Sequence, residues 1–265
     1  MSENYLAINK KSWNKQTAIH IDSDFYDVPG FLAGKNSLNS IELELLGDLK
    51  GKKVLHLQCH FGQDSISLAR MGAVVTAVDF SDVAITYANQ LNKQTKTNVT
   101  FICCDVYDLP NQLKEKFDLV FTSYGTIGWL PDINKWANVV SHFLKPIGDF
   151  IMAEFHPVIW MYDRALINIQ HRYFNDNPIE EIEEGTYAQP DSKIKQEYVS
   201  WNHGLGEVIN SLIKKGLRIA SIQEFDYSPY NCFRNTVEFE PGKFQIKHWG
   251  NKVPMVYAIK ARKVG

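Results

Sequence analysis

From Lys53 onward, the chain alternates short apolar runs with longer segments of helical periodicity. This alternation is typical of a parallel β-sheet whose strands are joined by helices that pack on its faces. Parallel strands joined in this way almost always have right-handed crossovers. We therefore expect an α/β fold. The expected strands are 54–57, 73–78, 99–103, 117–122, 150–155, 217–225 and 254–261, and the expected helices are 64–71, 81–94 and 204–215.

Two segments interrupt this alternation. Residues 157–202 are rich in aromatic and charged side chains, and residues 228–252 alternate polar and apolar side chains around a Pro-Gly turn, which indicates a hairpin. Because no linker divides the chain, we expect one domain, 1–265, with two insertions. The aromatic residues of 157–202 form either a wall for an apolar or planar acceptor, or the small core of a hairpin or dimer contact. The acidic run 180–184 is expected to be a solvated face.

The charge of the chain limits its partners. Its formal net charge is -2 and its pI is about 6.4, so no basic field favours nucleic acid or an anionic membrane. The N-terminus lacks a signal-peptide pattern and no apolar run approaches the roughly 20 residues of a membrane span, so we expect a cytoplasmic protein. The four cysteines lack the paired spacing of a zinc site, and no metal is expected.

Polar features follow three successive predicted strands. The loop 58–63 follows the first strand, Asp79 ends the second and Asp105 follows the third. Ligands of open α/β sheets bind outside the carboxyl ends of the strands, where the topology switches direction. A carboxylate at 79 can accept hydrogen bonds from two ribose hydroxyls, and one at 105, beside the amide of Val106, can accept one from an adenine amino group. Either aspartate alone is as readily a turn residue or helix cap.

These features together resemble the class I methyltransferases that use S-adenosylmethionine (SAM). The first motif of that family runs acid-any-Gly-any-Gly-any-Gly, and Val54-Leu-His-Leu-Gln-Cys-His-Phe-Gly62 matches it in register. His56 stands in place of the acid, Gln58 and His60 stand in place of two glycines, and Gly62 is retained. The resemblance also includes the segments 76–81, 104–106, 117–121, 145–148 and 253–257.

The resemblance implies a Rossmann-like, seven-stranded and mostly parallel sheet with helices on both faces and an antiparallel last strand. It implies SAM as cofactor, S-adenosylhomocysteine as product, and residues 1–50 as an N-terminal helical lid. Because SAM has no phosphate, polar side chains that would block a pyrophosphate are compatible with its zwitterionic methionyl end. The residues expected to bind the cofactor are His56, Gln58, His60, Gly62, Asp64, Asp79, Phe80, Asp105, Val106, Ser123 and Tyr124.

Methyl transfer is an in-line displacement that depends mainly on alignment and exclusion of water, so no catalytic triad is required. The segment 122–126 is expected to face the methyl group. His156, at the end of the fifth strand, is a candidate base, and His203 is a second histidine that this strand end would bring near it. Tyr124 is a candidate for positioning the acceptor. The structural alternatives are that both histidines cap secondary structure and that Tyr124 packs against the sheet edge.

The expected acceptor is a small molecule that is methylated on oxygen, nitrogen or carbon. The segment 122–126 contains neither the Asn/Asp-Pro-Pro-Tyr pattern of exocyclic base methylation nor a Pro-Cys nucleophile, so DNA is disfavoured, and RNA ranks below a small molecule. Two other functions remain open. They are an NAD(P)-dependent oxidoreductase, which the same β-α-β unit can serve, and a SAM- or S-adenosylhomocysteine-binding module without catalysis. The chain is expected to be a monomer or a homodimer.

Overall fold

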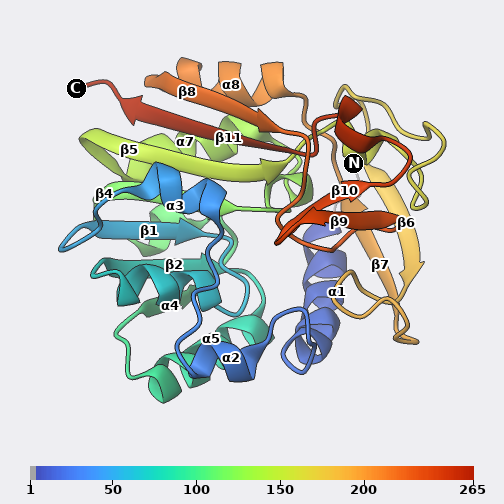
Figure 1. Cartoon of the computed structure of the whole chain (residues 1–265). Coiled ribbons are helices and arrows are strands. Elements are labelled where there is room, and N and C mark those ends of the chain that lie inside the picture. The colour runs from blue at the N-terminus through green and yellow to red at the C-terminus, as the bar shows by residue number, and fades with distance from the viewer. Residues whose placement is uncertain (1–3) are drawn as a thin grey trace.

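The computed structural model describes residues 4–265, and its main feature is a seven-stranded sheet (Figure 1). The strands are β1 (Lys53–Leu57), β2 (Val74–Asp79), β3 (Thr100–Cys103), β4 (Phe117–Ser123), β5 (Leu144–Phe155), β8 (Leu217–Phe225) and β11 (Val256–Lys263). Their order is β3-β2-β1-β4-β5-β11-β8. The first five strands pair in parallel, and β11 runs antiparallel to β5 and β8. The expected fold class is confirmed.

Helices cover both faces of the sheet. Because successive strand residues point to opposite faces, Leu119 and Phe121 of β4 belong to one buried cluster and Val120 belongs to the other. The helices that contribute to the first cluster are α2 (Val28–Leu32), α3 (Ser40–Leu46), α4 (Gln63–Arg70) and α5 (Asp82–Thr95). Those that contribute to the second are α6 (Leu109–Gln112), α7 (Ile133–Phe143) and α8 (Leu205–Lys214).

The main departure from the expected elements is β5, which begins at Leu144 rather than at Phe150. The turn expected over 145–148 is an irregularity inside this strand. Its register with β4 moves from the pair Phe117 and Leu144 to the pair Leu119 and Asp149, and φ is 59° at Ile147. Extra residues in one strand of a pair break the alternation of side chains, so the apolar pattern does not reveal the first part of β5.

One helix and two hairpins lie beyond the carboxyl ends of the parallel strands (Figure 1). They are α1 (Tyr5–His20), the antiparallel pair β6 (Ile179–Glu184) and β7 (Lys195–Ser200), and the antiparallel pair β9 (Thr236–Glu240) and β10 (Lys243–Ile246). Short 3₁₀ helices are η1 (Ile127–Trp129), η2 (Ile159–Met161) and η3 (Gly250–Lys252). Within residues 4–265, no helix has the length and apolar character to cross a membrane.

The middle of the sheet is the topological switch point. β1 and β4 are neighbours there, and the chain continues from β1 toward β2 on one side and from β4 toward β5 on the other. The loops that leave β1 and β4 therefore diverge and leave a crevice at their carboxyl ends. The helix α1 and the hairpins lie over this edge of the sheet (Figure 1).

Candidate active site

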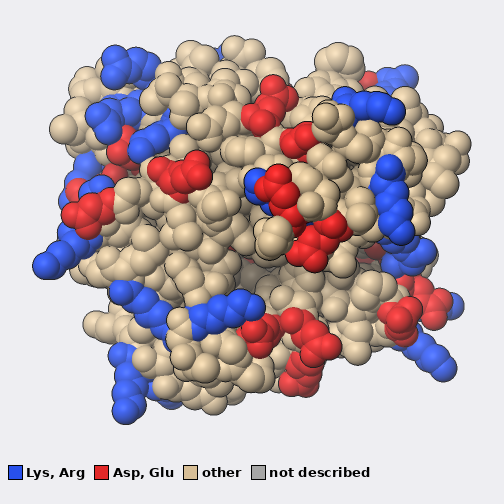
Figure 2. Space-filling model, in the orientation of Figure 1, with Lys and Arg blue, Asp and Glu red and all other residues tan. Residues whose placement is uncertain are grey.

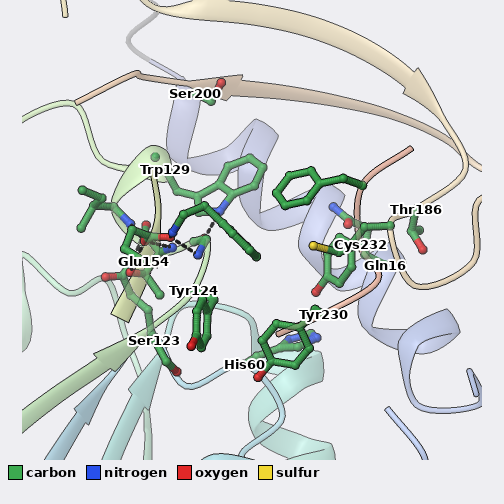
Figure 3. Close-up of a pocket in the computed structure, with 18 of the residues that line it drawn as sticks. Gln16, His60, Ser123, Tyr124, Trp129, Glu154, Thr186, Ser200, Tyr230 and Cys232 are labelled. Atoms are coloured by element: carbon green, nitrogen blue, oxygen red, sulfur yellow. Dashed lines mark hydrogen bonds between the residues drawn. The ribbon is translucent and has the colours of Figure 1, made fainter. Parts of the chain in front are cut away.

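A cavity of about 660 Å³ lies at the carboxyl ends of the parallel strands (Figure 3). Its lining divides into two groups. The sheet wall comprises the lining residues of 56–64, 79–80, 123–129 and 154–155, which follow or end β1, β2, β4 and β5, together with Tyr257 of β11. The cover wall comprises the lining residues of 13–39 and 157–234, which come from α1, from the segment that follows it and from the insertions.

The loop after β1 has the backbone conformation of a glycine-rich turn, although two of the glycine positions are occupied by residues with side chains. Gln58, His60 and Gly62 have φ values of 56°, 51° and 84°, within the left-handed region that favours glycine. These are the three positions that match the glycines of the methyltransferase motif. The left-handed conformation costs a residue that has a Cβ about 1 to 2 kcal/mol. The chain thus keeps the shape of the motif at two positions where its usual residue is absent.

Gly62 is the position at which no side chain fits. A Cβ there would lie 2.6 Å from Cζ of Phe101 and 3.0 Å from Cβ of Ala88. Gly62 is also the N-cap of α4, where the loop becomes a helix. Backbone conformation and lack of space therefore both select glycine.

The backbone and the side chains of the residues at the other two positions hold the loop in place. The His60 N–H donates to Oδ2 of Asp79 at 2.8 Å, and Nε2 of His60 lies 3.0 Å from Nδ1 of His20. Nε2 of Gln58 donates to the carbonyl of Thr126 at 2.7 Å. Oε1 of Gln58 is buried and has no partner within residues 4–265. These contacts offset part of the strain, and they leave one acceptor atom free at the cavity.

Asp79 ends β2 directly beside this loop. Its Oδ1 accepts a hydrogen bond from the Ser81 N–H at 2.9 Å, while its Oδ2 accepts the one from His60. Burial raises the pKa of the Asp79 carboxyl from 3.8 to about 6. Each carboxylate oxygen can accept more than one hydrogen bond, and Asp79 lines the cavity, so acceptor capacity remains for a ligand.

The other residues expected near this loop also line the cavity. Nδ1 of His56 lies 2.8 Å from Oγ of Ser65, and burial lowers the pKa of His56 to about 3, so its ring is neutral at pH 7. Oδ2 of Asp64 accepts a hydrogen bond from Oγ of Ser123 at 3.1 Å, and burial raises the pKa of Asp64. Phe80 lies at the end of β2 beside Asp79.

Asp105 and Val106 are separated from the main cavity. They line a second cavity of about 30 Å³, which residues of α1 cover. Asp79 and Phe80 line both cavities, so the two spaces adjoin at the end of β2. Oδ1 of Asp105 accepts a hydrogen bond from the Tyr107 N–H at 3.0 Å, which is the turn role that any such aspartate can have.

Residues 54–148, which contain the loop and both aspartates, match the family model of a methyltransferase domain. The chain contains a class I, SAM-dependent methyltransferase domain. This match decides between the two enzyme classes in favour of methyl transfer. SAM is accordingly the methyl donor.

Several known methyltransferases are similar to this chain. The ubiquinone biosynthesis O-methyltransferase of Coxiella burnetii is 24% identical over 209 residues, which cover 78% of this chain and 82% of that protein. An uncharacterized methyltransferase of Synechocystis is 32% identical over 133 residues, which cover 49% and 60%. The structure of a SAM-dependent methyltransferase from Mesorhizobium loti has a TM-score of 0.58 at 20% identity and covers 88% and 100%. The structural likeness supports the same fold.

Tyr124 lies on the sheet wall of the methyltransferase cavity, opposite Tyr230 (Figure 3). Its hydroxyl donates to Oε2 of Glu42 at 2.8 Å, and its ring is edge-on to that of Tyr230 with centroids 5.1 Å apart. Burial raises the pKa of Tyr124 well above its ordinary value, so the hydroxyl stays protonated. Tyr124 therefore contributes a fixed aromatic surface to the cavity.

His156 does not line the cavity of the methyltransferase domain. Its Nε2 lies 3.0 Å from Oε1 of Glu224 on β8, and its Nδ1 accepts a hydrogen bond from the Val158 N–H at 3.2 Å. β5 ends at Phe155, so strand alternation no longer sets the direction of the next side chain. The position of His156 at the correct sheet edge therefore did not bring its ring into the site.

His203 does line the cavity, but both of its ring nitrogens have partners. Nδ1 lies 3.1 Å from Oε2 of Glu207, and Nε2 lies 2.7 Å from the carbonyl of Leu130. Its side chain is fully buried. His203 does not cap α8, whose N-cap is Gly204 without a side-chain hydrogen bond, and its ring instead links Glu207 to the carbonyl of Leu130.

Glu154 is a central residue of the site that the sequence reading missed. It is 2% exposed, and its carboxylate accepts hydrogen bonds from the backbone N–H groups of Gly125, Thr126, Ile127 and Phe155. It therefore fixes the loop that follows β4 (Figure 3). The available signal was an acidic residue inside the apolar strand Phe150–Phe155, because a buried carboxylate needs such partners.

Proposed function

We propose that this protein transfers the methyl group of SAM to a small-molecule acceptor inside the 660 Å³ cavity, with the cofactor against the sheet wall and the acceptor against the cover wall. When bound, SAM supplies an electrophilic methyl group on its sulfonium. The volume lies within the range of small-molecule pockets.

The observation that carries the proposal is the loop 58–62, which keeps a left-handed backbone at all three motif positions beside the buried Asp79. The polar atoms left without partners suit the cofactor. Oε1 of Gln58 is an acceptor, and Nε1 of Trp13 is a donor. A methionyl end carries an ammonium and a carboxylate, which need one of each. The carboxylate of Asp79 would hold the ribose hydroxyls.

We assign the adenine to the space beside Asp105 and Val106. That space is about 30 Å³, which accommodates only one or two water molecules. Binding of an adenine there requires α1 to move, because residues of α1 cover the space. Residues 1–50 would therefore act as a lid that opens for cofactor exchange, and the insertion 157–202 would cover the acceptor.

The names of similar proteins support a small-molecule acceptor. One relative is named for O-methylation in ubiquinone biosynthesis, and one structural neighbour, with a TM-score of 0.55, is a glycopeptide N-methyltransferase. The net charge of -2 also means that the chain has no overall positive charge to attract nucleic acid. We therefore place neither DNA nor RNA in this cavity.

The residues of the chain would act mainly by alignment and by exclusion of water. Glu154 holds the loop after β4, and Glu42 holds the Tyr124 hydroxyl, so the surface that faces the reaction is fixed in advance. The cover wall would shield the reaction from solvent. Since His156 points away from the cavity, we assign no general base and give Tyr124 a positioning role.

A thermal-shift titration tests the cofactor assignment. A ligand at about 100 times its Kd, if it binds only the folded state, adds about 2.7 kcal/mol of stability and raises the melting temperature. We expect S-adenosylhomocysteine to do so and NADH to have no effect. Stabilisation by NADH alone would contradict the proposal. Binding of SAM without release of S-adenosylhomocysteine, across a panel of oxygen, nitrogen and carbon acceptors, would indicate a non-catalytic module.

A further inference from the structure

β6 has one isoleucine and two glutamates on each of its faces, and the face with Ile179, Glu181 and Glu183 lines the cavity. Ile182 is 74% exposed, while Glu181 and Glu183 line the cavity with side chains 32% and 28% exposed. Alternate residues of a strand point to opposite faces, so Glu181 and Glu183 point to one side of β6 and Ile182 points to the other. The expectation of a solvated acidic face is therefore wrong for Glu181 and Glu183.

The carboxylate of Glu181 has polar partners but no strong cation. Its Oε2 accepts a hydrogen bond from the Tyr198 hydroxyl at 2.9 Å, and its Oε1 lies 3.3 Å from Nε2 of His171. Within residues 4–265, no Lys or Arg forms an ion pair with it. Glu183 has Arg164 at 3.9 Å, a distance that leaves the carboxylate accessible to a second donor.

The charge of the whole lining has the same sign. Seven Asp or Glu residues and three Lys or Arg residues line the cavity, although the chain as a whole is nearly balanced at 30 acidic and 28 basic residues. Of the three bases, Lys35 is paired with Asp27 and Arg164 with Glu183. Figure 2 shows acidic side chains around the hollow beside the ends of β1 and β2. A cleft of one sign attracts ligands of the other.

An independent observation comes from Asn202, which is 3% exposed and lines the cavity. Its Nδ2 donates to the carbonyls of Pro157 and Arg172, both at 3.0 Å, which fixes the orientation of the amide. Its Oδ1 is buried and has no partner within residues 4–265. An unpaired buried acceptor costs about 1 to 3 kcal/mol, so this atom favours a ligand that carries an N–H or O–H donor.

Aromatic rings complete this part of the cavity. Trp129 and Tyr198 meet edge to face, with centroids 5.5 Å apart, and the Tyr198 hydroxyl contacts Glu181. Phe155, Trp160 and Phe233 form a second group of rings that lines the same space. Ring faces attract ammonium groups, and aromatic residues combined with carboxylates are suited to bind them.

We infer that the methyl acceptor carries a cationic amine, which Glu181 and Glu183 hold beside the rings of Trp129 and Tyr198. The inference rests on the proposed function of the cavity and adds the chemical class of its acceptor. It concerns recognition, so the amine is an anchoring group, whether or not it is also the atom that is methylated.

The test measures binding by isothermal titration calorimetry at saturating S-adenosylhomocysteine. Three probes share one phenol scaffold: tyramine is a cation, 4-(2-hydroxyethyl)phenol is neutral and 3-(4-hydroxyphenyl)propanoate is an anion. We expect tyramine to bind at least about tenfold more tightly than either analogue, a difference of about 1.4 kcal/mol. Glu181→Gln should remove most of this preference. Glu180→Gln, on the exposed face of the same strand, is the matched control and should retain it.

The outcomes distinguish a failure of the proposed function from a failure of the cationic-acceptor inference. If S-adenosylhomocysteine itself does not bind, the proposed function fails. If it binds but tyramine shows no advantage, or if the advantage survives in both Glu181→Gln and Glu183→Gln, the cationic-acceptor inference alone is overturned. Melting temperatures of all variants establish that they are folded, and Glu183→Gln provides the reading if Glu181→Gln is too unstable.

Discussion

The two walls of the cavity are held in place by different kinds of contact. The sheet wall follows from loops that leave adjacent parallel strands, which the backbone pairing of β1 with β2 and with β4 holds side by side. The cover wall is joined by side chains from distant segments. Asn9 of α1 makes two 2.8 Å hydrogen bonds to the backbone of Val199 on β7.

This difference predicts different behaviour. The sheet wall is part of the folded core, so changes in it should affect stability and cofactor binding together. The cover wall is an added layer, and we expect it to loosen without loss of the sheet.

The largest effect is expected for Gly62→Ala in the sheet wall. The new Cβ would lie 2.6 Å from the Phe101 ring, at a residue whose φ is 84°. Overpacking and left-handed strain together should lower the free energy of unfolding by about 3 kcal/mol. Urea denaturation measures this, and calorimetry should show weaker S-adenosylhomocysteine binding in the same variant.

The matched control for this substitution is Gly206→Ala. Gly206 lies in α8 with nothing within 4 Å of the added Cβ, and its φ is not positive. Alanine in a helix is favoured over glycine by about 1 kcal/mol, so this control should be neutral or stabilising. Equal stability of the two variants would mean that the loop adapts and that Gly62 is not essential to its shape.

A smaller effect is expected for Asn9→Ala in α1, the helix that contributes Trp13 and Gln16 to the cover wall. The substitution leaves the N–H and the carbonyl of the buried Val199 without partners, which should cost about 2 kcal/mol. Hydrogen exchange should become faster in α1 and β7 and should stay unchanged in β1 and β4. Lys11→Ala, on the exposed side of α1, is the control. Uniformly faster exchange would show that the cover is part of the cooperative core.

The pH dependence of cofactor binding should be the smallest effect, at about tenfold. Burial raises the pKa of Asp79 to about 6, and a carboxylate that accepts hydrogen bonds from ribose must be ionised. The affinity for S-adenosylhomocysteine should therefore fall about tenfold from pH 7 to pH 5, and Asp79→Asn should abolish this step. A pH-independent affinity in the native protein would argue against this role.

The same carboxyl should affect folding in the opposite direction. Its folded pKa of about 6 exceeds the ordinary value of 3.8, so the folded state binds the proton more tightly. The contribution of Asp79 to stability is then greatest below pH 4 and is lost as the pH rises through about 6. Comparison of native and Asp79→Asn unfolding free energies at pH 4 and pH 7 isolates this contribution.

The residues of the sheet wall could be predicted from the sequence, because the ends of the strands can be recognised from the apolar runs. The end of β2 placed Asp79, and the register of the first motif placed Gln58, His60 and Gly62. The positive φ at 58 and 60 was not visible, since their side chains gave no indication of a left-handed backbone.

The contacts of the cover wall could not be predicted from the sequence, because they join segments with no common periodicity. Asn9 and Val199 are separated by 190 residues, and nothing in either segment indicates the other. The inward side of β6 was also hidden, since each face of this strand has one isoleucine and two glutamates and the pattern does not show which face is buried. His156 was misplaced because its strand ends one residue earlier.

The most direct test of the account is the affinity of Asp79→Ala for S-adenosylhomocysteine, measured by isothermal titration calorimetry at pH 7. Asp108→Ala is the control, because this exposed carboxylate has its side-chain hydrogen bonds within residues 4–265 to Asn111 and Gln112. The account predicts at least about a tenfold loss of affinity for Asp79→Ala, near 1.4 kcal/mol, with none for the control. An affinity unchanged within about twofold, in a variant that is still folded, would contradict the placement of the cofactor against the sheet wall.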